Sequence, residues 1–188
     1  VLTVGMECAC APYSWTQDSP SGDAVPISNR PGSYANGYDV MIARTICAAQ
    51  GWALEITVLD WDELVPALNA GTVDAVINAQ FMTPARLAEL EMAGPYFCDT
   101  AVCVAKSGSE QASARGLSQL YGTCTAQAGT VWYDLCLPQI PGAHVLPGPE
   151  TDEEVIAAVR SGSADFICTG LADALELCAV HPDLVLLD

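Results

Sequence analysis

The chain has 188 residues, of which 51% are hydrophobic and 15% charged, and its formal net charge at pH 7 is −17. This length and apolar content are typical of a folded globular protein and exclude an intrinsically disordered one. Lysine and arginine together number only six, so the sequence offers no basic surface for nucleic acid. No apolar run is long enough to span a bilayer. The sequence opens on an apolar run typical of a strand, so we expect any export signal to have been removed already.

The first half of the chain alternates expected strands and helices. Period-two and helical spacings of apolar residues, with Gly, Pro, Ser and Asn at the breaks, separate the segments. In chain order they are a strand at 2–6, a loop or hairpin at 16–37, a helix at 38–50, a strand at 53–59, a helix at 61–70, a strand at 73–77 and a helix at 83–90. Gly51 ends the first helix, and Thr83 caps the last one with Pro84 at its first position.

The pattern changes near Pro95. Residues 96–105 form a long extended run with no helix before it, as expected of a crossover between two lobes. The alternation then restarts with a strand at 122–127, a helix at 130–137, a strand at 144–146, a helix at 152–161, a strand at 164–168, a helix at 171–179 and a strand at 184–187. Strand–helix alternation favours parallel sheets covered by helices, so we expect an α/β protein with lobe 1 at 1–94, a hinge at 95–104 and lobe 2 at 105–188.

The two halves contain one similar string. Gly71-Thr72-Val73-Asp74-Ala75-Val76 resembles Gly162-Ser163-Ala164-Asp165-Phe166-Ile167 in having a glycine that ends a helix, a tight turn, an aspartate and a strand. Two related lobes would explain the similarity, and two unrelated helix–turn–strand units would explain it equally well.

Ligands of open α/β sheets bind beyond the carboxyl ends of the strands, so the residues after each strand are the site candidates. Arg86 opens a helix there, and its guanidinium matches a carboxylate bidentately, although it could instead pair with Glu89 on the surface. Gly129 and Thr130 follow the first strand of lobe 2, where glycine allows close backbone approach. The remaining candidates follow the other strands and are Glu7, Trp61, Asn78, Phe81 and Trp132.

Three strings carry a resemblance to a known family. They are Ala35-Asn36-Gly37-Tyr38-Asp39-Val40, Trp61-Asp62-Glu63-Leu64-Val65-Pro66-Ala67-Leu68, and Gly71–Ile77 running on to Thr83-Pro84-Ala85-Arg86. Their order and spacing resemble the family-3 extracellular solute-binding proteins of amino-acid ABC transporters. The resemblance implies a periplasmic-binding-protein-like type II fold, with two α/β lobes and a ligand cleft between them.

The resemblance also implies roles for the candidates. Arg86 and the Gly129-Thr130 pair would hold a ligand carboxylate, whereas Trp61, Phe81 and Trp132 would shape the side-chain pocket and Glu7 would face a cationic group. Members of the family carry a carboxylate for the ligand's ammonium where this chain has Gly170, and they continue beyond the end of this sequence. An α-amino acid is therefore not assured as the ligand.

The nine cysteines suggest disulfides in an exported protein. Catalytic thiols are not expected, because both histidines lie outside the candidate segments, and Cys8-x-Cys10 is too short for a usual zinc site. The pairs Cys124–Cys136 and Cys168–Cys178 could meet, or the cysteines could be small buried hydrophobes; Cys98 and Cys103 should not pair.

We therefore expect a non-enzymatic extracellular solute-binding component of an ABC importer. It would bind a small amino-acid-like carboxylate by hinge closure and deliver it to a membrane permease, without cofactor or metal. We expect it at the surface of a Gram-positive bacterium, made with a signal peptide and held by a lipid anchor. Two alternatives remain open: the extracellular sensing domain of a membrane signalling protein, and a prephenate- or arogenate-type dehydratase on the same fold.

Overall fold

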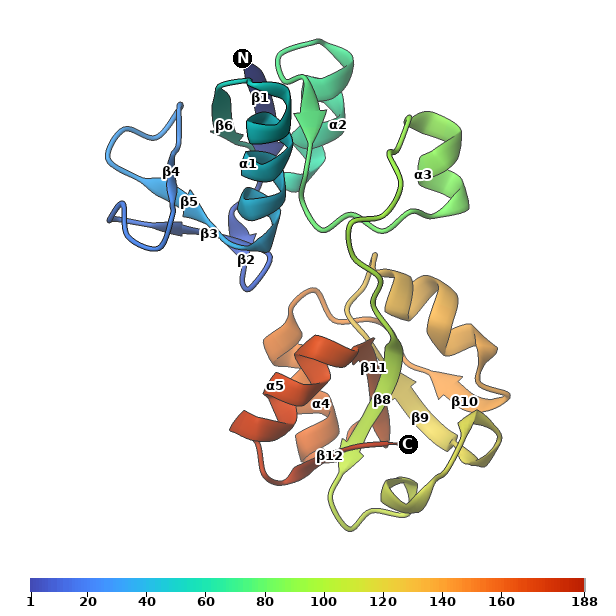
Figure 1. Cartoon of the computed structure of the whole chain (residues 1–188). Coiled ribbons are helices and arrows are strands. Elements are labelled where there is room, and N and C mark those ends of the chain that lie inside the picture. Colours follow the sequence, from blue (N-terminus) through green and yellow to red (C-terminus); the bar gives the residue numbers. More distant parts are fainter. Residues whose placement is uncertain (188) are drawn as a thin grey trace. The chain divides into compact units, whose positions relative to one another are not determined.

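The computed structural model describes residues 1–187, which divide into two compact units, Val1–Met82 and the residues from Thr83 onward. Both units are mixtures of helices and strands (Figure 1). Each is described by itself below.

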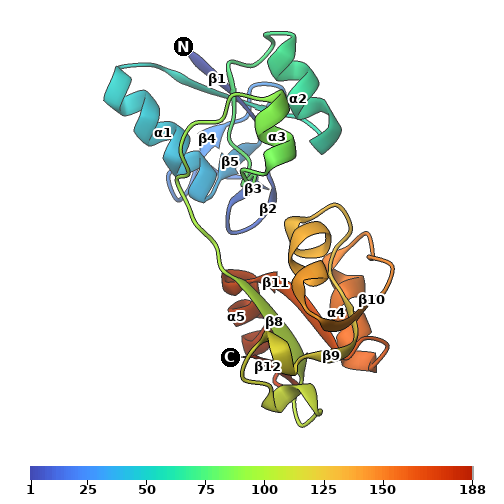
Figure 2. The same ribbon diagram turned by 90° about the vertical axis from the view of Figure 1, so that its right-hand side faces the viewer.

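The first unit is built on a three-stranded parallel sheet with the order β6-β1-β7. Its strands are β1 (Leu2–Met6), β6 (Leu54–Val58) and β7 (Ala75–Val76). Val4 and Met6 on one face join the buried cluster that includes Val40 of α1 (Tyr38–Gln50). Gly5, on the other face, lies against Leu64 of α2 (Trp61–Asn69). The two helices thus cover opposite faces, and Figure 2 shows β1 between them.

A second, antiparallel sheet of the first unit has the order β2-β3-β5-β4. Its strands are β2 (Ala9–Cys10), β3 (Ser14–Gln17), β4 (Val25–Pro26) and β5 (Tyr34–Asn36). Strands β4, β5 and the end of β3 lie in the segment at 16–37, for which the sequence predicts a loop or hairpin.

The second unit contains a five-stranded sheet with the order β10-β9-β11-β8-β12. Its strands are β8 (Ala101–Lys106), β9 (Tyr121–Thr125), β10 (Gly142–Val145), β11 (Phe166–Gly170) and β12 (Leu184–Leu186). Strands β9, β10 and β11 run parallel, whereas β8 runs antiparallel to both β11 and β12. The start of β8 therefore lies at the same sheet edge as the carboxyl end of β11.

Helices and short turns complete the second unit. They are α3 (Pro84–Glu89), α4 (Asp152–Ser161), α5 (Leu171–Val180), the 3₁₀ turns η1 (Gln111–Ser113), η2 (Leu117–Gln119) and η4 (Leu137–Gln139), and the π-helical η3 (Trp132–Cys136).

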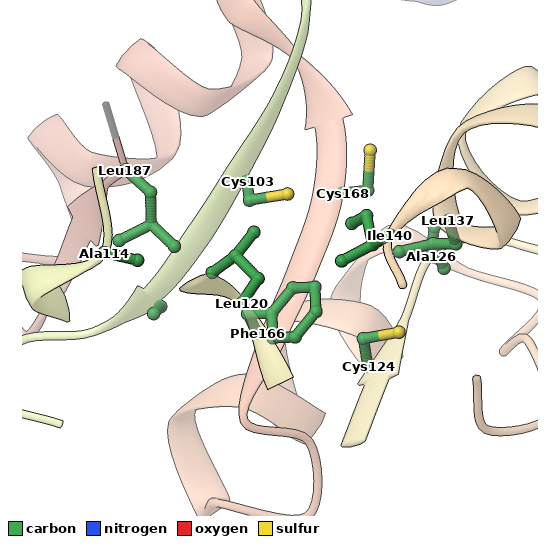
Figure 3. Packing of buried hydrophobic residues seen from close by; sticks show 11 residues of the cluster. Cys103, Ala114, Leu120, Cys124, Ala126, Leu137, Ile140, Phe166, Cys168 and Leu187 are labelled. Atoms are coloured by element: carbon green, nitrogen blue, oxygen red, sulfur yellow. The ribbon is translucent and has the colours of Figure 1, made fainter. Parts of the chain in front are cut away.

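The central sheet of the second unit is buried on both faces. On one face α4 and α5 supply Val155, Val159 and Ala174 to a cluster with Val104 and Ile167. On the other face Phe166 packs among the residues labelled in Figure 3, which include Cys103, Cys124 and Cys168. Apolar side chains on successive strand residues fit such a doubly covered sheet.

Most expected elements are confirmed, with ends that differ by at most two residues, whereas the expected extended run at 96–105 becomes a strand only from Ala101. The helices at 38–50 and 152–161 have the expected bounds, Gly51 ends the first in a left-handed conformation, and Thr83 caps α3 by accepting a hydrogen bond from the backbone of Arg86. The helix expected at 130–137 is present as η3 followed by η4 and is not an α-helix. Pro138 lies in η4 and has no N–H to continue an α-helical ladder.

The string that the two halves share has the same structural role in both units. The backbone of Asp74 donates to the carbonyl of Thr3 on β1, and the Thr3 N–H donates to the Asp74 carboxylate at 2.8 Å. Asp165 likewise bonds the carbonyl of Thr123 on β9, and its carboxylate accepts the Thr123 N–H at 2.7 Å and hydroxyl at 2.8 Å. In both units the aspartate fixes the strand that follows it to a neighbouring parallel strand.

Candidate functional site

Two predicted site residues of the first unit bind each other. Glu7 follows β1 and Asn78 follows β7, the adjacent parallel strand. The Glu7 N–H donates to the Asn78 Oδ1 at 2.8 Å, and the Asn78 Nδ2 donates to the Glu7 Oε2 at 2.9 Å. Asn78 is buried, so its amide orients the carboxylate of Glu7 at the edge where the strands end.

Two aromatic side chains lie in the segments that follow β6 and β7. Trp61 is the first residue of α2, where Asp60 and Glu63 form a capping box, and its side chain is 43% exposed. Phe81 is 38% exposed and lies beyond the end of β7. Aromatic rings exposed to this degree provide apolar surface that a ligand can cover.

Gly129 and Thr130 form the turn between β9 and η3. Gly129 has a φ of 74°, a left-handed conformation that favours glycine, and a side chain there would meet open space. The Thr130 hydroxyl donates to the Gln127 carbonyl at 2.7 Å and accepts from the Tyr133 N–H at 3.4 Å. The hydroxyl therefore holds the turn, and the turn's backbone N–H groups are the better candidates for an anion.

Arg86 lies in the first turns of α3, as the sequence predicts. Its side chain is partly buried, and burial lowers the pKa of its guanidinium. An arginine remains protonated at neutral pH despite such a shift. Two other arginines form ion pairs: Arg44 with Asp23, and Arg160 with Asp183.

Asp99 occupies the place that a side chain at Gly170 would fill. A Cβ on Gly170 would overlap Oδ2 of Asp99 and would lie 3.2 Å from Cζ2 of Trp132. The other carboxylate oxygen, Oδ1, accepts the backbone N–H of Leu171 at 3.2 Å and of Thr100 at 2.8 Å. A carboxylate is thus fixed at the start of α5, although residue 170 itself supplies none.

Asp99 is one of several acids that lie near Asp173. Burial raises the pKa of Asp173, and the nearby charges of Asp99, Asp152 and Glu176 raise it further. Burial also raises the pKa of Asp152. Like charges in proximity disfavour one another's ionised forms, so this end of the second unit favours a positively charged group.

Asp99 is the residue that the sequence analysis missed. It lies in the extended run before β8 and bonds a backbone group 72 positions further along the chain. Its local sequence carries no signal of this role, because the role depends on β8 running antiparallel beside β11. The absence of a carboxylate at Gly170 was the one available hint that another residue fills the space.

The cysteine pairings considered from the sequence are not formed. Cys124, Cys136, Cys168 and Cys178 are thiols. Cys168 belongs to the cluster on one face of the sheet, whereas Cys178 packs against the cluster on the opposite face, so these two cannot meet. Cys136 packs against the cluster that contains Cys124, and both remain thiols.

Neither a metal site nor a membrane span emerges from residues 1–187. No group of three or more His, Cys, Asp or Glu side chains in this part could hold a metal ion. None of its helices combines the length and apolar character that crossing a bilayer requires.

Comparisons with known proteins place these features in a family. The sequence model of the family described as bacterial extracellular solute-binding proteins, family 3, matches residues 2–131. The arginine-binding extracellular protein ArtP of Bacillus subtilis is 27% identical over 112 residues, which are 59% of this chain and 43% of ArtP. The chain spans about half or less of the length of the curated relatives it matches.

Solved structures agree with the fold. Holo ArgBP from T. maritima is 24% identical with a TM-score of 0.68, covering 98% of this chain and 75% of that one. The ancestral amino acid-binding protein AncCDT-1, a precursor of cyclohexadienyl dehydratase, is 22% identical with a TM-score of 0.71, covering 100% and 76%. These likenesses show the expected type II periplasmic-binding-protein-like fold. With a match over residues 2–131, the chain belongs to family 3 of the bacterial extracellular solute-binding proteins.

Proposed function

We propose that this chain is the ligand-binding part of an extracellular solute-binding protein that captures a small amino-acid-like carboxylate for an ABC importer. Capture would proceed by hinge closure, in which the ligand stabilises the closed form because it makes more contacts there. A membrane permease would be the partner. A signal peptide, a lipid anchor and a Gram-positive source remain parts of this proposal.

The observation that carries the proposal is the carboxylate of Asp99 at the start of α5. Gly170 has no carboxylate that could pair with the ligand's ammonium. An ammonium buried without a counter-charge would be energetically costly. Asp99 Oδ2 lies in the space of the missing side chain, and Trp132 flanks it. Two backbone N–H groups hold Oδ1, so the carboxylate is oriented before a ligand arrives.

The other ligand groups are assigned to the remaining candidates. Arg86 would pair with the ligand carboxylate through its guanidinium fork, together with the N–H groups of the turn at Gly129 and Thr130. Trp61, Phe81 and Trp132 would contact the ligand's side chain. Glu7, oriented by Asn78, would accept a cationic end.

A basic amino acid is the ligand we favour. The net charge of −17 attracts cations, and the surroundings of Asp99 and Asp173 are acidic. ArtP and ArgBP are named for arginine. A dehydratase is not favoured, since it would need a positioned acid and Glu7 is the nearest candidate, already bonded to Asn78.

The proposal is tested by a thermal-shift screen against the common amino acids, dipeptides and simple carboxylates, followed by titration calorimetry. A ligand at 100 times its dissociation constant should stabilise the protein by about 2.7 kcal/mol. Arg86→Ala should weaken binding by roughly thirtyfold or more, because a charge-paired guanidinium is lost. Arg44→Ala on α1 is the matched control and should bind as the parent does.

Two results would contradict the proposal. One is no stabilisation by any amino acid in the screen. The other is an affinity for an amino acid that Arg86→Ala leaves unchanged, which would remove Arg86 from the site.

A further inference from the structure

Two buried cysteines lie directly opposite each other on adjacent antiparallel strands. Cys103 of β8 is the register partner of Cys168 of β11. Their side chains are 6% and 3% exposed and lie in the same buried cluster, on one face of the sheet (Figure 3).

The backbone hydrogen bonds show whether Cys103 and Cys168 form a hydrogen-bonded or a non-hydrogen-bonded pair of the antiparallel ladder. The Leu187 N–H donates to the Cys103 carbonyl at 2.9 Å, so Cys103 directs its backbone groups toward β12 and away from β11. The Leu171 N–H donates to the Thr100 carbonyl at 2.9 Å, which marks that opposing pair as hydrogen-bonded. Because such pairs alternate along an antiparallel ladder, both observations make Cys103 and Cys168 a non-hydrogen-bonded pair.

Non-hydrogen-bonded pairs bring side chains closest together. Their Cα atoms lie about 4.5 Å apart, within the roughly 4.4–6.8 Å that disulfides span. A disulfide between Cys103 and Cys168 therefore requires no change of register.

The thiols differ in acidity. The hydrogen bond from Cys168 lowers the pKa of Cys103, whereas the same hydrogen bond and burial raise the pKa of Cys168. A third thiol, Cys136, packs against the same cluster, and burial raises its pKa.

We propose that Cys103 and Cys168 form a cross-strand disulfide when the chain folds in the presence of a small-molecule disulfide. One of the two cysteine thiolates attacks the small disulfide, forming a mixed disulfide and releasing one thiol. The other cysteine thiolate then attacks the protein sulfur of this mixed disulfide and releases the second thiol. Two cysteine thiols are oxidised and one disulfide is reduced to two thiols, so electrons and protons balance.

The bridge would join the two strands that position Asp99 and Gly170. Asp99 precedes β8 and Gly170 ends β11, so a covalent link at residues 103 and 168 fixes the ladder next to them. Since both thiols are buried in the folded protein, the bridge forms during folding and resists later reduction. This inference does not depend on which ligand binds.

The test refolds the full chain from denaturant and reductant in reduced and oxidised glutathione. Mass spectrometry of an unreduced digest should then find a peptide joining Cys103 to Cys168. The melting temperature of the oxidised protein should exceed that of the reduced protein by roughly 5–10 °C.

Cys103→Ala and Cys168→Ala should each remove the joined peptide and the temperature difference. Cys178→Ala is the matched control, because Cys178 packs on the opposite face, and it should keep both. Comparing oxidised with reduced samples of one variant cancels any loss of packing caused by the substitution. Nine free thiols after oxidative refolding of the parent, or a joined peptide linking Cys168 to Cys136 instead, would overturn the proposal.

Discussion

Both units use an aspartate to bind a neighbouring parallel strand. They differ in how they position the carboxylate that we assign to ligand binding. Asp74 in the first unit and Asp165 in the second each follow a helix and a glycine turn, and each binds a threonine of the neighbouring parallel strand. The string that the two halves share therefore sets the register between neighbouring parallel strands. The residues we assign to ligand binding lie outside it, at the ends of strands.

The carboxylates at those ends come from different kinds of strand. Glu7 follows the central parallel strand of the first unit and is oriented by the side chain of Asn78. Asp99 precedes an antiparallel strand of the second unit and is oriented by backbone N–H groups. An antiparallel strand begins where its parallel neighbours end, so it can deliver a residue from a distant segment to the same edge.

The largest effect on amino-acid binding is expected when the carboxylate of Asp99 is removed and a new one is placed at residue 170. Asp99→Ala should weaken amino-acid binding by roughly thirtyfold or more, because the ligand's ammonium loses its counter-charge. Asp99→Ala combined with Gly170→Asp should recover most of the loss, since the new side chain enters the vacated space. Calorimetric dissociation constants measure both.

Gly170→Asp alone serves as the control for this exchange. It should weaken binding and lower stability, because its side chain would collide with Asp99. A double variant that binds no better than Asp99→Ala would show that the carboxylate of Asp99 only caps α5.

A smaller effect is expected from the shared aspartates. Asp165→Ala removes two hydrogen bonds to Thr123 and should lower the free energy of unfolding by about 2 kcal/mol. Asp74→Ala removes one such bond to Thr3 and should cost about 1 kcal/mol. Urea denaturation followed by circular dichroism measures both. Equal losses, or none, would mean that these bonds do not set the registration.

The smallest effect concerns the acidic end of the second unit. Burial, and then Asp99, Asp152 and Glu176, raise the pKa of Asp173 above its ordinary value of 3.8. The folded state therefore favours protonated Asp173, and this contribution to stability is lost as pH rises through the raised pKa. Asp173→Asn should melt about 1–2 °C higher than the parent at pH 7, with the gap closing near pH 3.

Asp18→Asn in an exposed loop is the control for this pH dependence. It should shift the melting temperature equally little at both pH values. A gap for Asp173→Asn that widens toward low pH would reverse the assigned sign.

Local patterns predicted most of the elements but not their long-range partners. The helix over Tyr38–Gln50 and the cap at Thr83 follow from residues within one turn of each other, so the sequence predicts them. The partner of Asp99 and the opposition of Cys103 to Cys168 depend on the register between β8 and β11. Residues far apart in the chain set that register, and neither local sequence reports it.

Periodicity, turn chemistry and short motifs were enough to predict the family, the α/β alternation and the residues that follow each strand. Which of those residues contact one another follows from the fold. Glu7 met Asn78 because their strands are adjacent, and Asp99 met Gly170 because β8 runs against β11. The physical reason is that strand order and direction arise from burial of whole faces, which no single segment of the chain specifies.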